Sequence, residues 1–265
     1  MKNLGKSGVF FVCILCLTLQ GCKEVSNVLL PDIVSTDSRW IMRETGHLYI
    51  HYRPGSKAEH DISYLADYLE DCAIQVENYL DVRFHNKIIY LIYASIRDKE
   101  ENAREPGASC YAAPTLETVI SVYDPPHDVW AIGCHELVHV VMYWNVGAAV
   151  SYLLSEGIAV AVDGYWWGKP LHNNTAGLLD QGSLKSLDTM FNNKLWYPIH
   201  NEDEYLYYNQ AGSFVKYLVD QYGIQPFKLF YTRAFYRQFQ QTFQDIYQFS
   251  IDDFYNEWID FLRKV

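Results

Sequence analysis

Hydrophobic positions recur along this chain with two different periods, and each period predicts its own kind of element. Alternating apolar residues at 48–52 predict a half-buried strand, whereas the wholly apolar run at 88–93 predicts a buried strand. Another strand is expected at 119–123, where an Asp-Pro-Pro sequence closes it. Between the first two strands, apolar residues at helical spacing predict an amphipathic helix over about 58–80. The first lobe of the protein is therefore expected to mix strands and helices.

The second lobe is expected to be mostly helical. Residues 165–200 are rich in turns and aromatic side chains, and their pattern predicts no ordered series of elements. No linker, repeat or low-complexity block interrupts the chain, so one domain is expected over 40–265, with its two lobes meeting near residue 145. Helices are expected over about 128–143, 149–163 and 205–222. The first begins at His127 or Asp128, and Gly223 ends the third. Pro226 then opens another helix, and two further helices follow.

The first 21 residues have the form of a targeting segment. Two lysines precede an apolar run at 9–19, which is too short to span a bilayer as a mature helix. The run ends in Leu-Gln-Gly-Cys22, which resembles the lipobox of bacterial lipoproteins and implies a lipid on Cys22. We therefore expect a signal peptide at 1–21, a tether at 22–39, and a cell-envelope protein that faces the periplasm or the cell exterior on a lipid anchor.

The net charge argues against one class of partner, and the cysteine count limits the number of disulfides. Without the leader, 19 basic residues face 32 acidic ones, a formal charge of −13, which argues against nucleic acid as a partner. Three cysteines remain besides Cys22, so at most one disulfide can form within the chain. Their spacings do not resemble a cysteine zinc site. These three cysteines are Cys72, Cys110 and Cys134.

The most specific chemical signal is His-Glu-Leu-Val-His at 135–139. His135 and His139 are four residues apart, so on a helix they lie on one face and can bind a single zinc ion. Glu136 lies beside the metal without having to bind it, and a carboxylate there can take a proton from a zinc-activated water. The surrounding helix is apolar, and buried charged groups are costly unless they are paired or bind metal.

A catalytic zinc site needs a third protein ligand, and Glu156 is the candidate. It lies on the next expected helix within an otherwise apolar sequence, which favours burial and therefore a partner. The Asn-Val-Gly sequence at 145–147 provides a turn, so the two helices can pack antiparallel. Gly157 is expected to let the backbones of these two helices approach closely.

His-Glu-x-x-His followed by a helix with Glu-Gly-hydrophobic-Ala resembles the gluzincin peptidases, the group of thermolysin and the M1 aminopeptidases. The resemblance is nearest to the compact bacterial peptidase MA-like members, covers roughly 45–262, and extends to residues 208–218 and 243–262. It implies an α+β, thermolysin-like zincin fold with a mixed sheet-and-helix first lobe and a mostly helical second lobe. It also implies zinc as the cofactor, held by His135, His139 and Glu156.

Two positions depart from the pattern of the larger relatives. Thermolysin-like members carry an Asp four residues after the third ligand, where this chain has Val160, so the partner that orients the zinc histidines is not identified; Asp163 is a weak substitute. M1 aminopeptidases grip the substrate amine with a Glu on an upstream strand, where this chain has Cys110. An endopeptidase is therefore favoured, although Glu105 or Glu117 offers an acid in a shifted register.

A tyrosine is expected to stabilise the oxyanion of the transition state. Tyr205, Tyr207 and Tyr208 compete, and helical phase does not choose between Tyr207 and Tyr208. The resemblance favours Tyr208, because M1 enzymes place their tyrosine three residues before a pair of small residues, matched here by Ala211 and Gly212. This small pair is also expected to let the helix pack close to the zinc helix.

The leading prediction is thus a membrane-anchored zinc peptidase that hydrolyses peptide bonds with zinc-activated water and Glu136 as general base. Two alternatives stay open: a non-catalytic lipoprotein that serves as a binding or scaffold module, and a zinc hydrolase with a different substrate. Metal content tests the first alternative, and digestion of a peptide library tests the second. The sequence does not determine the substrate or the oligomeric state.

Overall fold

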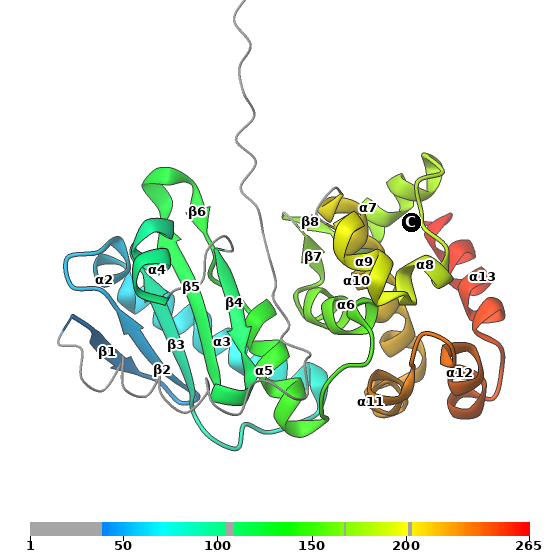
Figure 1. Ribbon diagram of the computed structural model, residues 1–265, viewed down its shortest axis with the longest axis horizontal. Helices are drawn as coiled ribbons and strands as arrows, with labels where there is room; N and C mark the ends of the chain where they lie inside the picture. Colours follow the sequence, from blue (N-terminus) through cyan, green and yellow to red (C-terminus); the bar gives the residue numbers. More distant parts are fainter. Residues whose placement is uncertain (1–38, 104–108, 167, 201–202) are drawn as a thin grey trace, which may run out of the picture. The chain divides into compact units, whose positions relative to one another are not determined.

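The computed structural model describes residues 39–103, 109–166, 168–200 and 203–265 (Figure 1). Cys22, the expected signal peptide and almost all of the expected tether lie outside the described residues, as does Glu105. The chain divides into two compact units. Of the described residues, 39–70, 86–103 and 109–132 form the sheet unit, and 71–85, 133–166, 168–200 and 203–265 form the helical unit. No helix in the described part is long and apolar enough to cross a membrane.

A mixed sheet forms the centre of the sheet unit. Its strands follow the order β1-β2-β3-β5-β4, with β6 also paired to β5 (Figure 1). β2, β3 and β5 are parallel, whereas β1, β4 and β6 pair antiparallel to their neighbours. The strands are β1 (Ile41–Glu44), β2 (Leu48–Tyr52), β3 (Ile88–Tyr93), β4 (Cys110–Ala113), β5 (Thr118–Asp124) and β6 (Val129–Trp130).

The three predicted strands are confirmed as β2, β3 and β5, the parallel centre of the sheet. β3 and β5 are almost wholly buried, which is why the sequence of β3 is a continuous apolar run and that of β5 is mostly apolar rather than alternating. The helix expected over 58–80 is present as α2 (Lys57–His60) and α3 (Ile62–Leu80), which are separated at Asp61. Strands β1 and β4 and helix α4 (Ile96–Ala103) were not predicted, because they are short and largely polar or half-exposed.

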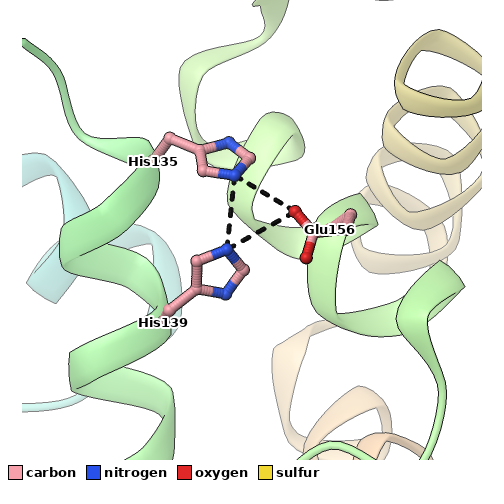
Figure 2. Close-up of side chains that lie close together, drawn as sticks. All are labelled: His135, His139 and Glu156. Carbon is pink, nitrogen blue, oxygen red and sulfur yellow. Dashed lines mark hydrogen bonds and ion pairs between the residues drawn. The ribbon is translucent and has the colours of Figure 1, made fainter. Parts of the chain in front are cut away.

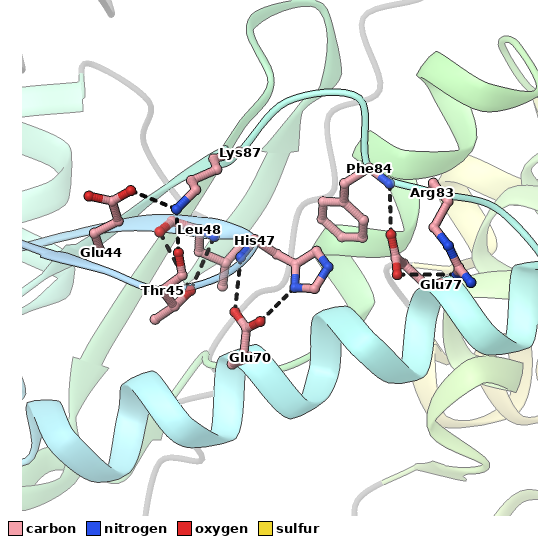
Figure 3. Close-up of polar contacts among 9 residues, drawn as sticks. All are labelled: Glu44, Thr45, His47, Leu48, Glu70, Glu77, Arg83, Phe84 and Lys87. Carbon is pink, nitrogen blue, oxygen red and sulfur yellow. Dashed lines mark hydrogen bonds and ion pairs between the residues drawn. The ribbon is translucent and has the colours of Figure 1, made fainter.

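Polar contacts hold the β1–β2 turn against α3 within the sheet unit (Figure 3). The backbone N–H of His47 donates to Glu70 Oε2 at 3.0 Å, and the His47 ring nitrogen Nδ1 lies 2.6 Å from Glu70 Oε1. Lys87, just before β3, bridges to Glu44 at 2.6 Å. These contacts fix the first half of α3 relative to the sheet edge from which β2 starts.

The helical unit begins with the second half of α3. In the loop that follows α3, the Phe84 N–H donates to Glu77 Oε1 at 2.9 Å (Figure 3). A disulfide joins Cys72 of α3 to Cys134, the residue before α5, and Cys110 is buried and not in a disulfide. The other helices are α5 (His135–Asn145), α6 (Tyr152–Asp163), α7 (Leu171–Asp180), α8 (Leu187–Phe191), α9 (Asn193–His200), α10 (Glu204–Tyr222), α11 (Ile224–Arg233), α12 (Phe239–Tyr247) and α13 (Ile251–Leu262).

Several predicted helix boundaries were wrong. The zinc helix starts at His135 rather than near residue 128, because a 3₁₀ turn at Pro125–His127 and strand β6 occupy the preceding residues. Helix α11 starts at Ile224, so Pro226 is its third residue and does not open it. Residues 165–200 contain five short elements, which include the hairpin β7 (Tyr165–Trp166) and β8 (Lys169–Pro170). The two strands of two residues and the five-residue helix α8 are too short to show a periodicity in the sequence.

Two glycines set the contact between α6 and α10. A Cβ on Gly157 would lie 2.5 Å from Val215 Cγ2 and 2.8 Å from the Ala211 carbonyl oxygen, both on α10. A Cβ on Gly212 would lie 2.9 Å from Val160 on α6. Close approach at Gly157 was expected against α5, and close approach at Gly212 against the zinc helix. Both expectations named the wrong neighbouring helix, because Gly157 of α6 lies against α10 and Gly212 of α10 lies against α6.

Candidate metal centre

The three expected zinc ligands lie together in the helical unit (Figure 2). His135 is the first residue of α5, and His139 is one turn later on the same face. Glu156 lies in the middle of α6 and is 2% exposed, and His139 is 4% exposed. Two neighbouring apolar helices therefore each present polar side chains to one point in the core.

The ligand atoms form a nearly regular triangle. His135 Nε2 lies 3.2 Å from His139 Nε2 and 3.2 Å from Glu156 Oε2, and His139 Nε2 lies 3.5 Å from the same oxygen. Zinc bonds of about 2.0–2.1 Å in a tetrahedron place ligand atoms about 3.3 Å apart. The triangle thus has the size of one face of a zinc tetrahedron, with the fourth position left for water or substrate.

Electrostatics of the trio agree with a cation-binding role. Burial disfavours the charged form of Glu156, yet the charges and hydrogen bonds of His139 and His135 hold its pKa well below its usual range. Burial likewise opposes charge on His135, but its hydrogen bond to Glu156 and the nearby carboxylates raise its pKa to about 9. A positive charge is therefore stabilised at this point of the core, whether a proton or a metal ion supplies it.

The outward nitrogen of His139 has a hydroxyl partner. With Nε2 directed into the triangle, Nδ1 lies 3.4 Å from the Oγ of Ser155, the residue before Glu156. Tyr231 of α11 is buried, which raises its pKa, and its hydroxyl also shares a hydrogen bond with Ser155. Ser155 and Tyr231 thus form a neutral, buried support behind His139, for which the sequence identified no partner.

Asp163, the weak substitute that the sequence offered as a partner for the zinc histidines, makes no hydrogen bond to His135. His135 Nδ1 is buried and has no hydrogen-bond partner among the described residues. Burial raises the pKa of Asp163 to about 6, and the charge of His135 acts in the opposite direction. Asp163 is therefore an electrostatic neighbour of His135 without a hydrogen bond in the described part. Val160 is fully buried and packs with Leu171 and Tyr208.

Glu136 and Tyr208 both lie close to the trio. Glu136 is in the first turn of α5 and 4% exposed. The ring of Tyr208 lies 5.9 Å from the His135 ring and stacks on Trp166 of β7, whose ring is 6.2 Å from His135. Tyr207 instead packs edge-on against Trp196 at 4.9 Å, and Tyr205 is 40% exposed. The ring contacts therefore place Tyr208 beside His135.

The expected amine-binding position falls on an edge strand of the sheet unit. Cys110 begins β4, the last strand in the order, and the four residues of this strand include no acid. Glu117 follows the 3₁₀ turn before β5, where the side-chain amide of Asn86 donates to its carboxylate at 2.9 Å.

Ser155, Tyr231 and Trp166 lie at the candidate site, and sequence reasoning missed them. Ser155 was predictable from the sequence, because it is a polar residue directly before the third expected ligand on a helix that otherwise buries apolar side chains. Trp166 lies in a two-residue strand, and Tyr231 lies on a helix far along the chain. Their proximity to the metal ligands depends on tertiary structure and leaves no local pattern.

Comparison with known proteins identifies the family to which this chain belongs. No curated protein sequence matches the chain. A solved structure of native yeast LTA4 hydrolase is similar over 85% of this chain and 38% of that chain, with 16% sequence identity and a TM-score of 0.44. Residues 106–264 match the profile of the Peptidase MA superfamily, and this match includes all three ligands and spans more than half of the chain. The protein therefore belongs to the Peptidase MA superfamily.

Proposed function

We propose that this protein is a zinc peptidase of the gluzincin kind, with a thermolysin-like two-lobed zincin fold, and that His135, His139 and Glu156 hold its metal. The observation that carries this proposal is the buried triangle of ligand atoms, whose edges of 3.2, 3.2 and 3.5 Å suit tetrahedral zinc. Family membership supports the peptidase chemistry. Zinc, when bound, supplies a Lewis acid that polarises the substrate carbonyl and lowers the pKa of a water.

Side chains of the protein carry out the other steps of the proposed mechanism. Glu136 takes a proton from the attacking water and later delivers it to the leaving amine. Tyr208 donates a hydrogen bond from its hydroxyl to the oxygen that becomes negative in the transition state. Ser155, supported by Tyr231, accepts a hydrogen bond from the N–H at His139 Nδ1 and so keeps Nε2 directed at the metal.

We also propose an endopeptidase, since β4 carries no acid that would hold a free amine. The experiment for the function is metal analysis of the full mature chain, together with digestion of a peptide library read by mass spectrometry. We expect one zinc per chain, internal cleavages, and loss of turnover with retained zinc in Glu136→Gln. A folded wild type without zinc would refute the metal centre, and zinc without cleavage would favour a binding module or another substrate.

The proposed location is the cell envelope, with a lipid on Cys22. The disulfide between Cys72 and Cys134 supports export, because disulfides persist in oxidising compartments and are rare in the cytosol. Replacing Cys22 by Ala is expected to release the protein from the membrane fraction or leave an uncleaved precursor. Unchanged fractionation and an unchanged mature mass would contradict the anchor.

A further inference from the structure

Glu204 has a carboxylate oxygen that no described residue uses. It is the first residue of α10 and half-buried, and its Oε1 is buried without a hydrogen-bond partner in the described part of the chain. Capping the helix does not explain it, because Asp203 already accepts the Leu206 N–H at 3.1 Å. A desolvated carboxylate without a donor costs free energy, so this position needs an explanation.

The position of Glu204 relates it to the metal centre. Glu204 and Tyr208 are four residues apart on α10, so they lie on one face of the helix, one turn apart. Tyr208 in turn lies against His135 and Trp166. Burial raises the pKa of Glu204 to about 7, and the charge of His135 acts to lower it. The carboxylate is therefore within electrostatic reach of the ligands.

We propose that Glu204 binds a positively charged group of the peptide substrate, an ammonium or a guanidinium, beside the metal centre. This inference rests on the proposed peptidase function and names a substrate class for it. A cation suits the site better than a neutral donor, because a desolvated carboxylate gains most from a charge-assisted hydrogen bond. A single carboxylate supplies too few ligands for a second metal ion.

Two further features favour a cationic substrate. The chain has a formal charge of −11, so its field attracts basic peptides and repels acidic ones. Tyr208, one turn from Glu204 on α10, stacks on Trp166, and aromatic faces attract ammonium and guanidinium groups. Both the charge of Glu204 and its aromatic neighbours therefore select the same chemistry.

The cation has two sources in a peptide, the free N-terminal amine and a Lys or Arg side chain. A positional-scanning set of peptides of one sequence separates them: each position in turn carries Lys or the uncharged norleucine, and the N-terminus is free or acetylated. Binding is measured by calorimetry on the zinc-loaded Glu136→Gln protein, so that turnover does not interfere. The same peptides are then measured on Glu136→Gln combined with Glu204→Gln.

We expect one charged form to bind more tightly than its neutral partner by at least about 30-fold, and Glu204→Gln to abolish that difference while leaving the neutral peptides unchanged. Asp220→Asn is the matched control, because Asp220 lies on the same helix, is exposed and pairs with Lys216 at 3.0 Å. It removes the same charge and should keep the preference.

Other outcomes are equally decisive. A preference for free amines alone would make the N-terminus the ligand and contradict the endopeptidase proposal. No preference for charge, an equal loss of binding by neutral peptides in Glu204→Gln, or failure to bind any peptide would overturn the role of Glu204. If the wild type holds zinc and cleaves no peptide while the preference persists, the peptidase proposal fails and the cation subsite stands.

Discussion

Trp166 stacks face to face on Tyr208, with the ring centroids 4.4 Å apart and an interplanar angle of 3°. Both rings also lie near His135, at 6.2 and 5.9 Å. A ring that stacks on a tryptophan and also lies against the His135 ring has little freedom to rotate away. This contact therefore fixes where the Tyr208 hydroxyl lies before substrate binds, which is the preorganisation that oxyanion stabilisation requires.

Tyr208→Phe removes one oxygen and should leave this stack intact. We expect kcat to fall by about 10²–10³-fold with zinc content unchanged, because one oxyanion donor is lost. Tyr207→Phe is the matched control, since Tyr207 is fully buried and its ring packs against Trp196. Steady-state kinetics on both variants decide the assignment, which is wrong if Tyr208→Phe is unimpaired or if only Tyr207→Phe is crippled.

Ser155→Ala tests the support behind His139. Removing the hydroxyl leaves His139 Nδ1 without its partner at 3.4 Å, so zinc affinity should fall by about 10–100-fold. Affinity is measured by competition with a chelator of known strength. Ser151→Ala is the control, because Ser151 is equally buried at the start of the same helix and its Oγ has no partner among the described residues. Equal affinities in the two variants would remove Ser155 from the site.

The sequence predicted that His135, His139 and Glu156 lie together, because the pattern that brings them together is local. His135 and His139 depend only on one turn of helix, and Glu156 was identified as a buried charge in an apolar helix. Strand β3 was also predicted from a local pattern, since burial on both faces leaves a continuous apolar run in the sequence.

The residues that surround the ligands were not predictable in this way. Trp166 reaches the site from a two-residue strand, and Gly157 contacts a helix more than fifty residues away in the sequence. Sequence spacing shows that a glycine permits a close approach, but it does not show which helix approaches. The error in assigning Gly157 to the contact with α5 follows from that limit.

The disulfide should contribute strongly to stability. Cys72 and Cys134 are 62 residues apart, and closing a loop of that size in the unfolded chain is worth about 4 kcal/mol on the chain-entropy model. Replacing both cysteines by Ser should lower the urea midpoint accordingly, measured with zinc present. Cys110→Ser, at a buried cysteine outside the disulfide, controls for the loss of a thiol from the core. If the double variant is no less stable than this control, the disulfide does not stabilise the fold.

Gly157→Ala should destabilise the protein even though alanine is the better helix former. The new Cβ would lie 2.8 Å from the backbone oxygen of Ala211, which cannot move without shifting α10. We expect a loss of about 1–3 kcal/mol from overpacking, larger than the gain of about 1 kcal/mol in helix propensity. Zinc affinity should fall as well, because Glu156 precedes the displaced residue. Gly177→Ala, also within a helix but with nothing within 4 Å of the new Cβ, should instead be neutral or stabilising. Thermal unfolding of both variants decides the matter: if Gly157→Ala is as stable as Gly177→Ala, close approach of α6 and α10 is not what this glycine provides.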